Sequence, residues 1–558
     1  MKKQLLFALT VVMLALVGCK NPQEFIDNVK QEPNPAQYKA GKVEVVFEGN
    51  FPEKYFTKNM TMTVVPVLTT SEGKVYRGEP VTYQGQKVKG NDKVIRYKVG
   101  GKYTQTAVFD YEEGMESSTI SLEATVHTSK KDYQLPVAVV GKGANITPLL
   151  ASVKPGTGDL QAMIIPDKFQ RIIEERTNAQ IKYLINQSNI RSSELKTEEM
   201  LVLTNTIKNL KKDTSRQIKN IELSSYASPD GGMDINEKLA NNRGKSADSY
   251  INKELKKIKA SVSIDSKITA EDWEGFQELV NNSNIEDKAI ILRVLSMYSD
   301  PDQREAEIRK LSVAYKTLAE EVLPELRRSK MSLVVNVVGR SDEQIAALAA
   351  SADFAQLSEE EILYAATLTS DYAQKQAIYT KATEAYPNSV RAYNNLGFAY
   401  YEQNKIADAE RCFQKALSIE SGNNIANYNM GLVKLINNDI AAAEQYFGKA
   451  GGVGKGLDYA QGVIAILRGN YKKAAQLFGN SASNNAALAH LLNNDNGAAR
   501  RALDNNKNAN ATTYYLKAVL AARTNNKSEY QSAIAQAIKL DMNYQTRAAK
   551  DVEFDNVR

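Results

Sequence analysis

Cysteine, histidine and tryptophan are scarce in this sequence, and their scarcity excludes several kinds of protein. The 558 residues include two cysteines, two histidines and one tryptophan. Cys19 and Cys412 provide no disulfide framework, so the fold must be stabilised by packing. His127 and His490, without a His-Glu-x-x-His motif, do not predict a histidine-based metal site. We therefore expect neither a bound metal nor a disulfide-stabilised scaffold.

An excess of charge of one sign is also missing. The 71 basic and 65 acidic residues are spread along the chain and leave a net charge of +6, so no basic stripe predicts nucleic-acid binding. Residues 451–458 resemble a phosphate loop superficially, but Gly456 stands where serine or threonine should bind magnesium, and we expect an inter-repeat turn. Carboxylates such as Glu359–Glu361 stand at predicted helix starts, where they favour the dipole. We expect no enzymatic activity and no cofactor.

The length and composition predict several folded domains. A chain of 558 residues exceeds the size at which one hydrophobic core keeps growing, so two to four domains are expected. Apolar residues make up 43% and charged residues 24%, which is ordinary for globular proteins. After the N-terminus, no apolar stretch is long enough to cross a bilayer.

The first twenty residues have the organisation of an export signal. Lys2 and Lys3 precede an apolar run over residues 5–17 that is too short for a transmembrane helix. Its end, Leu-Val-Gly-Cys, resembles a bacterial lipobox; an ordinary secretory signal with a chance cysteine is the alternative. The resemblance implies a signal peptide over 1–18 and a membrane anchor of acyl chains on Cys19, where each buried methylene contributes about 0.8 kcal/mol. Residues 19–40, proline-containing and without an apolar period, are predicted to be a tether.

The next region changes to short alternating runs. Within residues 41–152, segments such as VEVVF, KVIRYKV and TISLEATV alternate apolar and polar side chains and are separated by glycine-containing turns. This pattern predicts a β-sandwich. Residues 155–341 then mix strand and helix patterns and predict an α/β sandwich, with a helical insertion at about 269–325. We expect Trp273, in that insertion, to be a core anchor rather than a ligand platform.

One stretch of the α/β region carries a family motif. After a Ser-Pro-Asp-Gly-Gly turn, Asn236, Leu239 and Arg243 match the helix motif of OmpA-like peptidoglycan-binding domains, and the resemblance covers about 175–340. It implies a pocket for diaminopimelate in the wall peptide. Arg243 would hold the carboxylate, because its planar fork donates two parallel hydrogen bonds, and Asp230 would meet the ammonium. The family's usual aspartate is Ser228 in this chain, so either Asp230 replaces it, or the domain is a scaffold that does not bind peptidoglycan.

The C-terminal region repeats with a period of 34 residues. Gly397, Ala409 and Phe413 correspond to Gly431, Ala443 and Phe447. The pattern resembles tetratricopeptide (TPR) repeats and covers about 355–545. It implies an all-helical superhelix with a concave groove for protein segments; a bundle of unrelated hairpins is the alternative. Cys412, at helical spacing, is expected to be a small apolar filler.

Together these predictions describe a multidomain lipoprotein: an N-terminal β-sandwich, a central OmpA-like sandwich and a C-terminal TPR superhelix. We expect it to be anchored in the outer membrane facing the periplasm, to bind peptidoglycan through Asp230, Asn236 and Arg243, and to scaffold envelope proteins through the TPR groove. The alternative is an accessory subunit of an outer-membrane assembly or secretion machine whose OmpA-like domain does not bind peptidoglycan. The outer-membrane location is inferred from the OmpA resemblance and from the lack of aspartate directly after Cys19.

Overall fold

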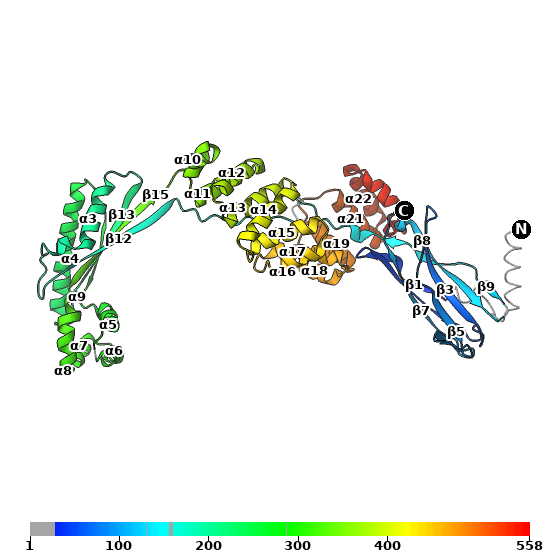
Figure 1. Ribbon diagram of the computed structural model, residues 1–558, viewed down its shortest axis with the longest axis horizontal. Helices are drawn as coiled ribbons and strands as arrows, with labels where there is room; N and C mark the ends of the chain where they lie inside the picture. Colours follow the sequence, from blue (N-terminus) through cyan, green and yellow to red (C-terminus); the bar gives the residue numbers. More distant parts are fainter. Residues whose placement is uncertain (1–27, 130, 156–159, 286) are drawn as a thin grey trace. The chain divides into compact units, whose positions relative to one another are not determined.

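The computed structural model describes residues 28–558 except 130, 156–159 and 286 (Figure 1). The chain divides into two compact units: a flanking unit, which joins the described residues up to Asp167 with Thr369–Arg558, and a central unit, Lys168–Leu368. The predicted signal peptide and Cys19 lie outside the described residues. Within them, no helix combines the length and the apolar character needed for a transmembrane span.

The flanking unit begins with two β-sheets around one core. The first has the strand order β11 (Ala144–Asn145), β1 (Lys30–Lys39), β2 (Lys42–Phe51), β7 (Gly101–Asp110). The second runs β10 (Ala138–Lys142), β8 (Ser118–His127), β3 (Thr61–Thr70), β5 (Val81–Gly85), β6 (Lys93–Ile95), with β4 (Val75–Arg77) on β3 and β9 (Asp132–Gln134) on β8. Alternate residues such as Val45 and Phe47 of β2 and Val64 of β3 point into the shared core. The predicted sheet-rich region is confirmed.

The predicted tether over 19–40 is wrong for residues 30–39, which form β1. Gln31 and Ala36 are buried, and β1 pairs with β2 on both sides of a register shift between Glu32 and Gln37. Pro33 falls within that shift, where its missing N–H leaves no ladder bond unmade. The prolines of this segment led the sequence analysis to predict a tether where the structure has a strand.

The central unit has a four-stranded sheet covered by helices. Its order is β12 (Ile172–Lys182), β15 (Arg328–Val338), β13 (Arg216–Tyr226), β14 (Ile264–Thr269), with β13 and β14 parallel and the other pairs antiparallel. Helices α3 (Glu198–Leu210) and α4 (Met233–Lys257) bury apolar residues such as Leu203 and Ile251 against Ile221 and Leu223. The predicted mixture of strands and helices, with a helical insertion, is present. The unit begins at Lys168, however, and not at 155.

The helical insertion of the central unit has its own core. It comprises α5 (Trp273–Asn282), α6 (Lys288–Met297), α7 (Pro301–Arg309), α8 (Ser312–Thr317), a π-helical turn (Leu318–Val322) and α9 (Leu323–Leu326). Trp273 packs against this core, with its ring centroid 5.6 Å from that of Phe276, as expected of an anchor. Helices α10 (Asp342–Ala350) and α11 (Glu359–Ala365) follow β15 within the same unit.

The rest of the flanking unit is helical. Its helices are α12 (Tyr372–Ala385), α13 (Val390–Glu402), α14 (Ile406–Ile419), α15 (Asn424–Ile436), α16 (Ile440–Gly448), α17 (Lys455–Leu467), α18 (Tyr471–Phe478), α19 (Asn484–Leu492), α20 (Asn496–Asp504), α21 (Ala511–Arg523), α22 (Lys527–Leu540) and α23 (Asn543–Lys550). The helices α19 and α20 have nine residues each and lie within the predicted array.

Recurring glycine–phenylalanine contacts explain the 34-residue period. A Cβ on Gly397 would lie 2.6 Å from Cε1 of Phe413, and one on Gly431 would lie 2.5 Å from Cε1 of Phe447. A Cβ on Gly462 would likewise lie 2.9 Å from Cε2 of Phe478. Each glycine thus lets the second helix of a pair place its ring directly on the first helix. The predicted repeat is confirmed, and these contacts give its physical cause.

Candidate functional site

The start of α4 holds the residues that the sequence assigned to peptidoglycan. Asn236, 3% exposed, donates from Nδ2 to the carbonyl of Gly231 at 2.7 Å and so closes the turn before the helix. The same amide lies 3.3 Å from Oε1 of Glu271. Asn236 therefore has a structural role in positioning the turn that carries Asp230.

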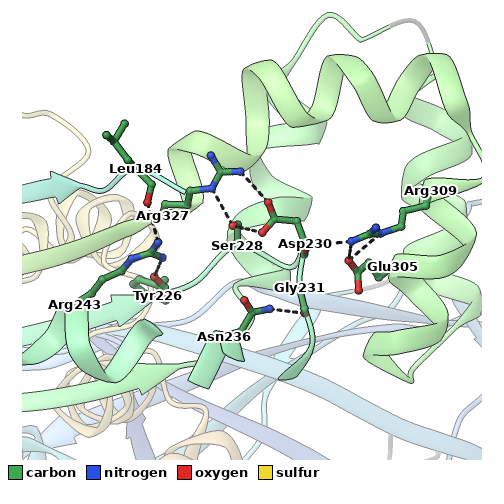
Figure 2. A network of polar contacts seen from close by, with 10 residues as sticks. All are labelled: Leu184, Tyr226, Ser228, Asp230, Gly231, Asn236, Arg243, Glu305, Arg309 and Arg327. Carbon is green, nitrogen blue, oxygen red and sulfur yellow. Dashed lines mark hydrogen bonds and ion pairs between the residues drawn. The ribbon is translucent and has the colours of Figure 1, made fainter. Parts of the chain in front are cut away.

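Arg243 lies two turns further along α4, on the same face as Asn236, and is buried within the protein, 1% exposed. Its Nη1 donates to the carbonyl of Tyr226 at 2.9 Å and its Nη2 to that of Leu184 at 3.4 Å (Figure 2). Its Nε donates to the carbonyl of Gln187 at 3.0 Å. The guanidinium also stands 5.3 Å from the centroid of the Tyr183 ring. Desolvation lowers the pKa of Arg243 to about 10, and the side chain stays charged at neutral pH. The guanidinium fastens α4 to the ends of β12 and β13.

Asp230 is engaged by a different arginine. Nη2 of Arg327 lies 2.8 Å from Oδ2 of Asp230, and the side chains are 10% and 14% exposed. Ser228 donates from Oγ to Oδ1 of Asp230 at 2.5 Å, and Nε of Arg327 donates to the same Oγ at 3.2 Å. Arg309, on α7 of the insertion, donates to the backbone carbonyl of Asp230 at 3.0 Å (Figure 2).

The structure therefore brings the predicted residues into one network but gives them other partners. Arg327 contacts both Ser228 and Asp230, whereas Arg243 donates its hydrogen bonds to backbone carbonyls. In this conformation Arg243 offers no surface on which a carboxylate could bind. The expected pairing of Arg243 with a ligand carboxylate and of Asp230 with a ligand ammonium stays a prediction; in the structure both groups have partners within the chain. Sequence reasoning did not assign Arg327 to this site; it belongs to the basic pair Arg327–Arg328 at the junction of α9 and β15.

The open face of the central sheet carries a polar hollow of about 580 Å³. Its lining comes mainly from β12, β13 and β15 and includes Arg176, Gln180, Glu222, Ser224, Lys330 and Ser332. Arg176 and Glu222 form an ion pair at 2.8 Å in which both side chains are nearly half exposed, so the hollow has no excess of either charge. The residues that line the hollow therefore do not indicate which class of ligand it would bind.

The array of repeats already holds a segment of its own chain. We call residues 150–155 and 160–167, which follow the β-sandwich, the strap. Three asparagines on first helices of repeat pairs (α13, α15 and α19) each accept from the N–H and donate to the carbonyl of one strap residue, at 2.7–2.9 Å. The pairs are Asn485 with Ser152, Asn429 with Met163, and Asn395 with Ile165. Residues 160–167 thus pack on the array, and their assignment to the α/β domain is wrong.

The strap also makes side-chain and tyrosine contacts. Leu160 is 1% and Ala162 6% exposed, and both join the hydrophobic core of the array. Tyr401 donates to the carbonyl of Leu160 and Tyr428 to that of Gln161, each at 3.1 Å. The face of the array that they occupy is not open to other chains in this conformation.

Two further predictions concern the array and its chemistry. Gly452 and Gly454 have φ of +86° and lie in the turn between α16 and α17, which confirms the inter-repeat turn for residues 451–454, whereas residues 455–458 begin α17. Cys412 is a free cysteine, and burial raises the pKa of its thiol to about 11, which suits a structural filler. Among the residues that the structure describes, no cluster of three or more His, Cys, Asp or Glu side chains could hold a metal ion.

Comparison with known proteins identifies the repeat family for part of the chain. A tetratricopeptide repeat model matches residues 390–423, which span α13 and α14. Solved structures with similarity include PilF of Pseudomonas aeruginosa (18% identity, 38% of this chain and 100% of that chain, TM-score 0.29) and a tetratricopeptide repeat protein of Parabacteroides merdae (14%, 50% and 98%, 0.27). YrrB, described as a TPR protein with an unusual peptide-binding site, has 20% identity over 31% of this chain and 97% of that chain, with a TM-score of 0.24. No curated protein matches the sequence.

These findings define the class of the C-terminal region. The family match and the recurring glycine–phenylalanine contacts identify a tetratricopeptide array, a module for protein–protein interaction. Such arrays are generally scaffolds and not enzymes. For the C-terminal region, these repeats indicate protein–protein interaction.

Proposed function

We propose that this chain is a lipid-anchored scaffold of the bacterial cell envelope that holds proteins together and performs no catalysis. The tetratricopeptide array carries this proposal, because stacked repeats provide extended surfaces for protein partners. The lipobox that ends at Cys19 supports anchoring by acyl chains. The OmpA resemblance and the lysine that follows Cys19 support a location on the periplasmic face of the outer membrane.

Metabolic labelling with a radioactive fatty acid tests the anchor. We expect label in the full chain, its loss in Cys19→Ser, and its retention in the matched control Cys412→Ser. Membrane fractionation should place the native protein in the outer membrane and release Cys19→Ser from it. Equal labelling of native chain and Cys19→Ser would contradict the proposal.

For the central unit, we propose an OmpA-like fold that serves as a scaffold and does not bind peptidoglycan. The buried Arg243 and the Asp230–Arg327 ion pair support this, since neither charged group is free for a zwitterionic ligand. The whole protein is then an accessory subunit of an outer-membrane assembly or secretion machine. Site-specific photo-crosslinking in cells tests it, because such a subunit gives discrete crosslinks to outer-membrane proteins.

Peptidoglycan binding is the second candidate for the central unit. The convergence of Ser228, Asp230 and Arg243 near the start of α4, as the family resemblance requires, favours it. Co-sedimentation with purified sacculi distinguishes peptidoglycan binding from the scaffold function. Pelleting of native protein that is lost in Asp230→Asn, with the exposed Asp234→Asn as matched control, would support this candidate. Absence of pelleting would leave the scaffold function.

A further inference from the structure

The three asparagines of the array contact the strap as a neighbouring β-strand would. Each carboxamide exchanges two hydrogen bonds with the N–H and C=O of a single residue, the exchange found in a hydrogen-bonded antiparallel pair. Asn395 and Asn429 stand 34 residues apart, at equivalent positions of successive repeats, and are 2% and 0% exposed. Because only main-chain groups of the strap are used, these contacts select an extended backbone and not a particular side chain.

A second set of contacts selects small or apolar side chains at two positions. Leu160 and Ala162 enter the core of the array, whereas Gln161 between them is exposed. Gly456 of α17 permits the approach of the strap, because a Cβ there would lie 2.7 Å from Cε of Met163 and 2.9 Å from Oη of Tyr428. The site thus accepts an extended segment with an apolar residue followed two positions later by a small one.

The residues before the strap are fastened to the end of the array. Asn145 donates to Oε1 of Glu553 at 2.7 Å and Thr147 to the same oxygen at 3.1 Å, while Arg523 forms an ion pair with Glu553. A ligand held in this way competes intramolecularly, at an effective concentration on the order of millimolar. An external segment making equivalent contacts would have to overcome that advantage.

We propose that the strap is an intramolecular ligand that closes this face of the array to extended segments of other proteins. A partner segment with the same apolar and small side chains binds only after the strap has left. The array is thereby autoinhibited in its resting state, and protein partners of the resting chain contact other surfaces. This inference concerns the array alone and holds whether or not the central unit binds peptidoglycan.

A fluorescent peptide with the strap sequence Leu-Gln-Ala-Met-Ile-Ile-Pro-Asp tests the proposal on the full chain. Leu160→Asp places a carboxylate in the apolar core and should expel the strap, so we expect at least about tenfold tighter peptide binding than to the native chain. Gln161→Asp adds the same charge at an exposed position and should bind as the native chain does. Adding Asn395→Ala and Asn429→Ala to Leu160→Asp should abolish binding.

Equal affinity of the native chain and Leu160→Asp would overturn the proposal, as would a folded Leu160→Asp that binds no peptide. Circular dichroism and thermal melting establish whether this variant is folded. If this variant is not folded, amide hydrogen exchange of the native chain tests whether the strap occupies the array. We expect exchange at Met163 and Ile165 to be slowed at least about a hundredfold relative to an unstructured chain. Exchange at the unstructured rate would show that the strap does not close the site.

Discussion

Arg327 and Asp230 stand 97 residues apart in the chain, yet Nη2 of one lies 2.8 Å from Oδ2 of the other in a largely buried ion pair. Ser228 bridges them by accepting from Nε of Arg327 and donating to Asp230. The sequence motif implied a ligand ammonium beside Asp230; in the structure its carboxylate meets Arg327. This pair also joins the turn before α4 to the segment that leads into β15, so the central unit depends on it.

Removing one partner of this pair should destabilise the central unit. Arg327→Ala leaves a poorly solvated carboxylate without a cation, and we expect a loss of about 3 kcal/mol in the free energy of unfolding. Denaturation by urea, followed through Trp273 of the same unit, measures it. Lys310→Ala, which removes the exposed pair with Glu307, is the control and should change stability by less than about 0.5 kcal/mol. Equal effects would show that burial of the Arg327 pair has no consequence.

Arg243 should tolerate no conservative replacement. Lysine keeps the positive charge, but its donors all sit on one nitrogen, which cannot take the places of the three guanidinium nitrogens that reach the carbonyls of Leu184, Gln187 and Tyr226. We expect Arg243→Lys to lower the unfolding free energy by about 2 kcal/mol, because buried carbonyls lose their donors. The reverse exchange at the exposed Lys245 on the same helix, Lys245→Arg, should be neutral. A stable Arg243→Lys would mean that the guanidinium contacts are not structural.

The glycine of each repeat should be sensitive to one added methyl group. Gly397→Ala places Cβ 2.6 Å from the Phe413 ring, and overpacking of this kind costs about 1–3 kcal/mol. Thermal melting of the full chain measures the loss, and Phe413→Leu in the same chain should recover part of it. Gly422→Ala, with no atom within 4 Å of the new Cβ, is the matched control. An additive double variant would contradict the contact between these positions.

Acid should weaken the joint between the β-sandwich and the array. Burial alone would raise the pKa of Glu553, but the Arg523 guanidinium and the hydrogen bonds from Asn145 and Thr147 hold it below the ordinary value of 4.5. A carboxyl with a depressed pKa contributes stability above its unfolded pKa and loses it as the pH falls through the folded pKa. The contribution is therefore complete at neutral pH and declines below about pH 4.5.

Comparison of native chain and Glu553→Gln by thermal melting at several pH values tests this joint. We expect the native chain to melt higher at pH 7 and the difference to shrink as the pH falls below 4.5. An exposed carboxyl replaced in the same way, Glu48→Gln, provides the baseline for general charge effects. A difference that stays constant down to the acid transition would contradict a depressed pKa for Glu553.

The parts of the fold that could be predicted depend on neighbours close in sequence. The contact of Gly397 with Phe413 joins two helices of one hairpin, so residue sizes repeating at a fixed period are enough to reveal it. Alternation in β2 and β3 similarly marks the faces of their strands. The strand over residues 30–39 was missed because a register shift accommodates its prolines, and such a shift leaves no periodic signal.

The sequence by itself determined the export motif at Cys19, the alternating sandwich strands and the repeat period, since each is a local pattern of side-chain size and polarity. Only the tertiary structure decided the partners of Asp230 and Arg243 and the occupant of the array. Asn485 meets Ser152 across 333 residues and Asn429 meets Met163 across 266. The strap carries no side-chain pattern that announces such contacts, because the array binds its backbone, and every residue except proline presents the same N–H and C=O groups.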